Sequence, residues 1–173
     1  MYALTLIAAL SVPNSAIAPQ CEVVSKEIVD AVVQKTLADS NRVSGIQKVG
    51  DLVGSWVHRC PIADHSDRRA ISRSISRLLI RPELRSRAAI FLYQLGRDAV
   101  VARPAIRAAY LDEKRSMMRR EHDPAGVMGA AYEVRDGLRC LDIRLHGGKP
   151  SHELCKFLED FPNPERPTKD ERG

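Results

Sequence analysis

Apolar residues recur at every third or fourth position along most of this chain, which is the spacing of one side of an α-helix. Sustained alternation of apolar and polar residues, the pattern typical of strands, does not occur. We therefore expect an all-α fold of about seven helices. The predicted ranges are 22–38, 41–59, 67–80, 82–95, about 98 or 103 to 118, 124–145, and 151–161.

Residues with strong positional preferences mark the ends of these helices. Pro82 ends one helix and opens the next, which stops at Gly96, and Gly147-Gly148 ends the helix over 124–145. The predicted N-cap residues are Ser66, Asp123 and Ser151.

The first two helices are amphipathic and are joined by an Asp39-Ser40 turn, which predicts an antiparallel pair. The apolar face predicted for residues 22–38 consists of Val24, Ile28, Val32 and Leu37. The face predicted for residues 41–59 consists of Val43, Ile46, Val49, Val53, Trp56 and Val57.

The chain holds four cysteines, at 21, 60, 140 and 155, and four cysteines allow three pairings. Cys21 and Cys60 lie at equal distances from the Asp39-Ser40 turn. Cys140 and Cys155 lie at equal distances from Gly147-Gly148. Because equal distances from a turn place residues opposite each other in an antiparallel hairpin, we predict Cys21–Cys60 and Cys140–Cys155.

The beginning of the chain resembles a secretory leader. A short apolar run over residues 2–11 precedes the small-x-small pattern Ala16-Ile17-Ala18. We expect residues 1–18 to be a signal peptide and the protein to be periplasmic or secreted; a buried N-terminal helix is the alternative. Residues 19–161 then form one all-α domain, and the polar, proline-rich residues 162–173 form a disordered tail. No other stretch is apolar enough to cross a membrane.

One segment carries a resemblance to a known family. Residues 85–113 place Ala88-Ala89 in a first helix, Leu95-Gly96 at its end and Pro104-Ala105-Ile106 in a second helix. This pattern is similar to one HEAT-type repeat, and the rest of the chain has no such match. The resemblance implies antiparallel hairpins stacked as a short solenoid, and a scaffold that binds other proteins. An irregular helical bundle explains the remaining chain equally well.

Arginine stands at every fourth position from 69 to 81. This spacing turns each side chain by about 40° from the last, so the row stays on one side of the helix. Ile71, Ile75 and Leu78 lie on the other side. The predicted contact residues are Arg69, Arg73, Arg77, Arg81, Arg85 and Arg103.

The excess positive charge lies in the same part of the chain. Residues 66–120 contain fourteen Lys/Arg and five Asp/Glu, a net charge of +9, whereas the chain as a whole carries +5. Either this is a solvated helix face, or it contacts an acidic protein or an anionic envelope component. Nucleic acid is not expected, because of the leader and because no aromatic residues alternate with the arginines.

Catalytic motifs are absent from the sequence: there is no G-x-S-x-G, H-E-x-x-H, phosphate loop or dinucleotide fingerprint. Asp64-His65-Ser66-Asp67 holds suitable residue types, but adjacent residues rarely converge in space. His152 lies one turn before Cys155, a pairing that the predicted disulfide would inactivate. No histidines stand in an i, i+4 pair, so neither a metal nor a cofactor is implied.

Two function classes remain open from the sequence. The first is an exported, disulfide-stapled helical binding protein that recognises an acidic partner and is not an enzyme. The second is a small cell-envelope hydrolase with acid and base residues drawn from separate helices. The sequence makes no prediction of the oligomeric state.

Overall fold

The computed structural model describes residues 25–39, 42–59, 64–119 and 125–161, and all regular structure in these ranges is helical. The α-helices are α1 (Lys26–Ala38), α2 (Arg42–Arg59), α3 (His65–Ser76), α4 (Arg85–Gln94), α5 (Arg103–Arg119), α6 (Ala125–Leu145) and α7 (His152–Glu159). Three 3₁₀ helices accompany them: η1 (Arg77–Ile80), η2 (Pro82–Leu84) and η3 (Gly96–Ala102). The prediction of an all-α fold with about seven helices is confirmed.

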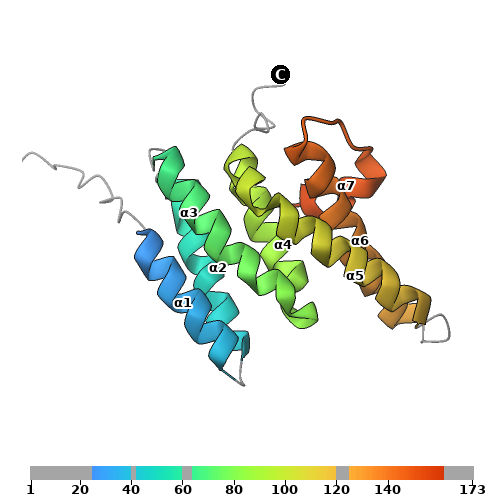
Figure 1. The fold of residues 1–173 in the computed structure, drawn as a ribbon, viewed down its shortest axis with the longest axis horizontal. Coiled ribbons are helices and arrows are strands. Elements are labelled where there is room, and N and C mark those ends of the chain that lie inside the picture. Colours follow the sequence, from blue (N-terminus) through green and yellow to red (C-terminus); the bar gives the residue numbers. More distant parts are fainter. Residues whose placement is uncertain (1–24, 40–41, 60–63, 120–124, 162–173) are drawn as a thin grey trace, which may run out of the picture.

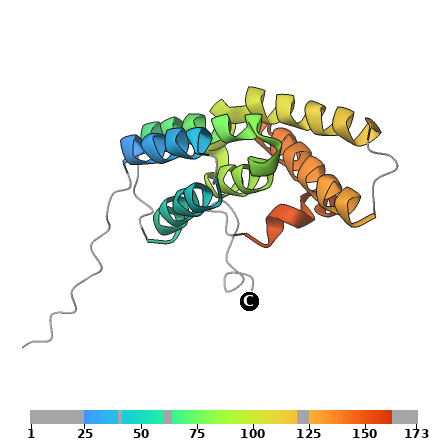
Figure 2. The ribbon, with the colours of Figure 1, turned by 90° about the horizontal axis from the view of Figure 1, so that it is seen from below.

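The helices lie in two layers (Figures 1 and 2). One layer contains α1, α3 with its continuation η1, and α5; α1 contacts α3, and η1 contacts α5. Below it, α2 contacts α4, and α4 contacts α6, which in turn packs against both α5 and α7. Chain neighbours α1 and α2 pack together, as do α5 and α6. The HEAT-type resemblance of residues 85–113 stays a prediction.

Helix α4 lies at the centre of the hydrophobic core. Every residue from Ala88 to Leu95 is buried, because α4 contacts α2, α3, α6 and α7 on its different sides. A helix that is apolar on all sides is stable only when neighbours cover it on all sides. The helices of both layers therefore pack around α4. None of the described helices is both long and apolar enough to span a membrane.

The buried face of α1 differs from the predicted one. Val29, Val33 and Thr36 are buried, whereas Ile28 is exposed and Val32 and Leu37 are only partly buried. The Thr36 hydroxyl donates to the Val32 carbonyl at 2.7 Å, which satisfies it in the core. A Cβ atom at Gly45 would collide with that hydroxyl, so α2 approaches α1 at this point through bare backbone. This close approach selects the Val29–Thr36 side of α1.

On α2, Val49 and Val53 are buried as predicted, and Ile46 is partly buried. The remaining members of the two predicted faces have side chains outside the described residues; these are Val24, Val43, Trp56 and Val57.

Several predicted helix ends need correction. The helix predicted over 22–38 begins only at Lys26, after an extended Ser25, and the helix predicted over 67–80 is α-helical only to Ser76 and continues as the 3₁₀ helix η1. Asp64, not Ser66, caps α3, because its carboxylate accepts the Ser66 N–H at 3.2 Å. Pro82 opens a 3₁₀ turn, since Arg81 before it is extended, and α4 begins only at Arg85. Helix α7 ends at Glu159, two residues before the predicted end. Gly96, with φ 61°, ends α4 as predicted, and Ser151 caps α7 as predicted. The predicted cap Asp123 lies outside the described residues.

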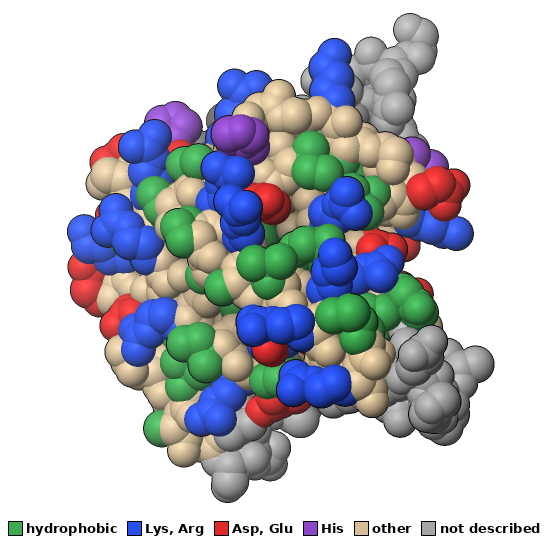
Figure 3. Space-filling model, turned by 45° about the vertical axis from the view of Figure 1, so that its right-hand side comes forward, with side chains coloured by type: hydrophobic (Ala, Val, Ile, Leu, Met, Phe, Trp, Pro, Cys, Tyr) green, Lys and Arg blue, Asp and Glu red, His purple; other side chains and the backbone are tan. Residues whose placement is uncertain are grey.

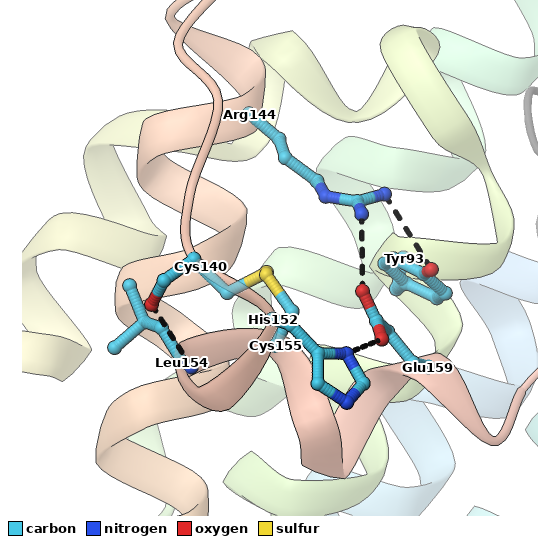
Figure 4. Close-up of a disulfide and its surroundings, with 8 residues drawn as sticks. Tyr93, Cys140, Arg144, His152, Leu154, Cys155 and Glu159 are labelled. Atoms are coloured by element: carbon cyan, nitrogen blue, oxygen red, sulfur yellow. Dashed lines mark hydrogen bonds and ion pairs between the residues drawn. A yellow bond between two sulfur atoms is a disulfide. The ribbon is translucent and has the colours of Figure 1, made fainter.

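The predicted disulfide between Cys140 and Cys155 is present, with a Cα–Cα distance of 5.3 Å and both residues buried. It joins α6 to α7 across Gly147, whose φ of 83° permits the turn. Beside it, the Arg144 guanidinium lies 3.6 Å from Glu159 and over the Tyr93 ring (Figure 4). The predicted partners Cys21 and Cys60 lie outside the described residues.

We expect the Cys140→Ala/Cys155→Ala double variant to lose about 3 kcal/mol of unfolding free energy, the chain-entropy value for a loop of 15 residues. The measurement is urea denaturation followed by far-UV circular dichroism. Equal stability of the double variant and the native protein would show that the disulfide does not hold α7 in place.

Candidate functional site

The predicted arginine row lies on the outer side of α3 and η1. Ile71, Ile75 and Leu78 are buried beneath it. Arg69, Arg73 and Arg81 are exposed, and Arg77 is partly buried. Arg77 lies 3.1 Å from the Asp30 carboxylate of α1, which also accepts the Ser74 hydroxyl at 2.7 Å. Asp30 of α1 is thus joined to α3 through Ser74 and to η1 through Arg77, the third arginine of the row.

Arg85 does not belong to this surface, and its prediction as a contact residue is corrected here. Its side chain is only 5% exposed. The Nε atom donates to the Leu79 carbonyl at 2.9 Å, Nη1 to Glu113 at 2.6 Å, and Nη2 to Asp112 at 2.7 Å. Two adjacent carboxylates of α5 hold the guanidinium inside the fold, where it cannot reach a partner.

The hydrogen bond from Arg85 is also the main cause that lowers the pKa of Asp112 below its ordinary value. Asp112 is therefore ionised at neutral pH, as the ion pair requires. Arg103, the sixth predicted contact residue, donates from Nε to Asp142 of α6 at 2.7 Å and is partly exposed.

Replacement of Arg85 by Met should lower the free energy of unfolding by about 3–5 kcal/mol, because it leaves the Glu113 carboxylate buried without its cation. The matched control is Arg81→Met, four positions earlier and exposed, for which we expect a change of about 0.5 kcal/mol or less. Chemical denaturation of both variants gives the comparison, and equal losses would contradict the role assigned to Arg85.

Two exposed arginines of the row, Arg69 and Arg73, line a pocket between α3 and η3. We call this the basic pocket; it is open and has a volume of about 600 Å³. Its lining residues are Asp64, His65, Ser66, Arg69, Arg73, Arg97 and Asp98. Two of the predicted contact residues, Arg69 and Arg73, therefore meet a third arginine that comes from a different element.

A buried carboxylate forms the floor of the basic pocket. The Asp98 side chain is 7% exposed, and its oxygens lie 2.9 and 3.0 Å from His65 Nδ1. Two guanidinium groups are also close, at 3.8 Å for Arg68 and 3.7 Å for Arg69. Asp98 thus joins the N-terminal turn of α3 to η3. His65, Arg68 and Arg69 of that turn all lie beside its carboxylate.

The remaining charges of the basic pocket make it positive. Asp64 is ionised, because the backbone N–H of Ser66 lowers the pKa of its carboxyl group. Three lining arginines still exceed the two lining carboxylates, and Arg68 adds a further cation behind Asp98. The pocket is therefore suited to an anion.

Sequence reasoning missed Arg97 and Asp98 because they lie in a connection and not on a periodic helix face. Gly96 was the available signal: its positive φ turns the chain, so that the two following residues return toward α3. That return could not be read from spacing alone.

The structure also decides whether His152 can activate the Cys155 thiol. Cys155 is in a disulfide, so His152 has no thiol beside it; His152 contacts Glu159 instead. Within the described ranges, no three His, Cys, Asp or Glu side chains converge as a metal site would require. Comparisons of the chain with protein-family models, curated proteins and solved structures find no match.

Proposed function

We propose that this protein is an exported helical binding protein whose basic pocket recognises an acidic partner. The observation that carries the proposal is that Arg69 and Arg73 of α3 and Arg97 of η3 line one open pocket. Convergence from two elements distinguishes this arrangement from a single solvated helix face. Guanidinium groups pair with carboxylate and phosphate oxygens through two parallel hydrogen bonds, which favours binding of such groups here.

The form of the pocket favours a macromolecular partner over a small molecule. It is open, and His65 at its edge is 79% exposed, whereas small-molecule sites bury most of their ligand. Acidic side chains of a protein chain, or the anionic groups of an envelope polymer, can enter such a pocket from the surface.

Export is part of the proposal and depends on two features. The pattern of residues 1–18 is typical of a secretory signal peptide, and the buried Cys140–Cys155 disulfide is typical of proteins that fold in an oxidising compartment.

The Arg69→Glu/Arg73→Glu/Arg97→Glu variant should bind a fluorescein-labelled dodeca-glutamate peptide at least about tenfold more weakly than the native protein, since it reverses three charges at one point. Fluorescence anisotropy at low salt measures the affinity, and rising salt should weaken native binding because screening acts over about 10 Å at 0.1 M.

The matched control is Arg139→Glu/Lys149→Glu/Lys156→Glu, which makes the same change in net charge at exposed residues of α6, α7 and their connection. An equal loss of peptide affinity in both variants would show that binding depends only on the net charge of the protein. Unchanged peptide affinity of the basic-pocket variant would show that the three arginines are solvated and do not bind the peptide.

A second candidate, the cell-envelope hydrolase, is favoured by the contact between His65 and buried Asp98. A carboxylate hydrogen-bonded to Nδ1 fixes the orientation of the imidazole. The Nε2 atom can then take a proton from a water molecule as the water oxygen attacks an ester, and can return the proton to the departing alcohol.

If this candidate holds, the native protein hydrolyses p-nitrophenyl phosphate or p-nitrophenyl acetate, and both His65→Gln and Asp98→Asn lose at least about tenfold in kcat/KM. Absence of turnover by the native protein, or equal turnover by the variants, would eliminate His65 as a base.

A further inference from the structure

The outer side of α5 carries a second surface feature next to the basic pocket. Two open cavities, of about 610 and 300 Å³, run along the helix and share Ala108. We call them together the α5 groove. Its apolar lining includes Val100, Pro104, Ala108, Leu111 and Ile80.

The apolar lining is exposed to an unusual degree. Ile80 is 74% exposed, Leu111 45% and Val100 41%, which makes them three of the large apolar side chains that remain accessible on the described part of the chain. The opposite side of α5 buries Ile106 and Met117 in the fold. Helix α5 is therefore apolar on two sides, and a single-domain protein needs only one of them for its core.

Arginines border the groove. Arg107 and Arg103 line the first cavity, and Arg103 also donates to Asp142 of α6 at 2.7 Å. Arg115 lines the second cavity. Asp112, the carboxylate of the second cavity, is held by Arg85 at 2.7 Å. Figure 3, which brings the α5 side of the molecule forward, shows apolar surface interspersed with many Lys and Arg side chains.

The α5 groove continues into the basic pocket through η3. Side chains at i and i+3 of a 3₁₀ helix lie above one another. Arg97, Val100 and Arg103 follow this spacing and are accessible, whereas Asp98, Ala99 and Ala102 between them are buried. Arg97 lines the basic pocket, and Val100 and Arg103 line the groove, so the row joins the two.

We infer that the α5 groove binds an amphipathic helix with acidic flanks, supplied by the acidic partner of the proposed function. Apolar anchors spaced i, i+3 or i+4, and i+7 would contact the apolar lining, and Asp or Glu beside them would pair with Arg107 and Arg115. Within α5 the lining runs from Pro104 to Leu111, which corresponds to about 11 Å of α-helix, or roughly two turns of a partner helix.

Charge complementarity decides between this occupant and a second copy of the chain. In a two-fold dimer the same patch would face itself, which would bring the arginines of one copy against those of the other. An amphipathic helix with acidic flanks instead supplies apolar side chains for the groove lining and carboxylates for the arginines at its border.

The probe for the test is a fluorescein-labelled 14-residue helical peptide of Leu and Glu, with Leu on one face. A scrambled peptide of the same composition and dodeca-glutamate are the comparison peptides. We expect Leu111→Glu and Ile80→Glu, two exposed positions on different elements, each to weaken binding of the amphipathic peptide at least about tenfold. Met118→Glu, also exposed on α5 but outside the groove lining, should leave it within about twofold.

The outcomes separate this inference from the proposed function. Leu111→Glu should leave dodeca-glutamate binding close to native, whereas the basic-pocket variant should lose it. Equal affinity for the scrambled peptide, or equal loss with Met118→Glu, would overturn the groove assignment alone. Sedimentation velocity tests the alternative occupant: a native dimer that Leu111→Glu converts to a monomer would show that a second copy of the chain occupies the groove. Circular dichroism of each variant verifies that it is folded.

Discussion

The arrangement of the upper layer depends on one buried guanidinium. Arg85 is the first residue of α4, and its donors reach the Leu79 carbonyl in η1 and the carboxylates of Asp112 and Glu113 in α5. A buried cation is tolerated only when its charge is neutralised and its hydrogen bonds are made. That condition fixes η1 beside α5, and with it the position of Ile80 along the groove.

The sequence made the helices, their number and one disulfide predictable, because each follows from local periodicity or from symmetry about a turn. Arg81 and Arg85 show why the site was only partly predictable. Both continue the same spacing of four, yet one is exposed and the other is buried, since the deciding carboxylates stand on a different helix 27 and 28 residues later. Arg97 and Asp98 depended on a turn at Gly96. The face of α1 depended on the contact between Thr36 and Gly45. Such long-range contacts are not encoded in spacing.

The disulfide and the two candidate binding surfaces belong to different parts of the fold. Cys140–Cys155 joins α6 to α7, and α7 packs against α6 and α4. The basic pocket is formed by α3 and η3, and the groove by η1, η3 and α5. The residues that form the disulfide are thus separate from the arginines proposed for recognition. A substitution in one set therefore does not directly change the other.

The row Arg97, Val100 and Arg103 has a consequence for how the chain can vary in length. Connections between helices usually accept insertions, because their residues make few specific contacts. In η3, however, one added residue would rotate every following side chain by about 120°. Arg97 would then keep its place in the basic pocket while Val100 turned out of the groove. We therefore expect related chains that retain both surfaces to keep this connection at seven residues, and length changes to fall elsewhere.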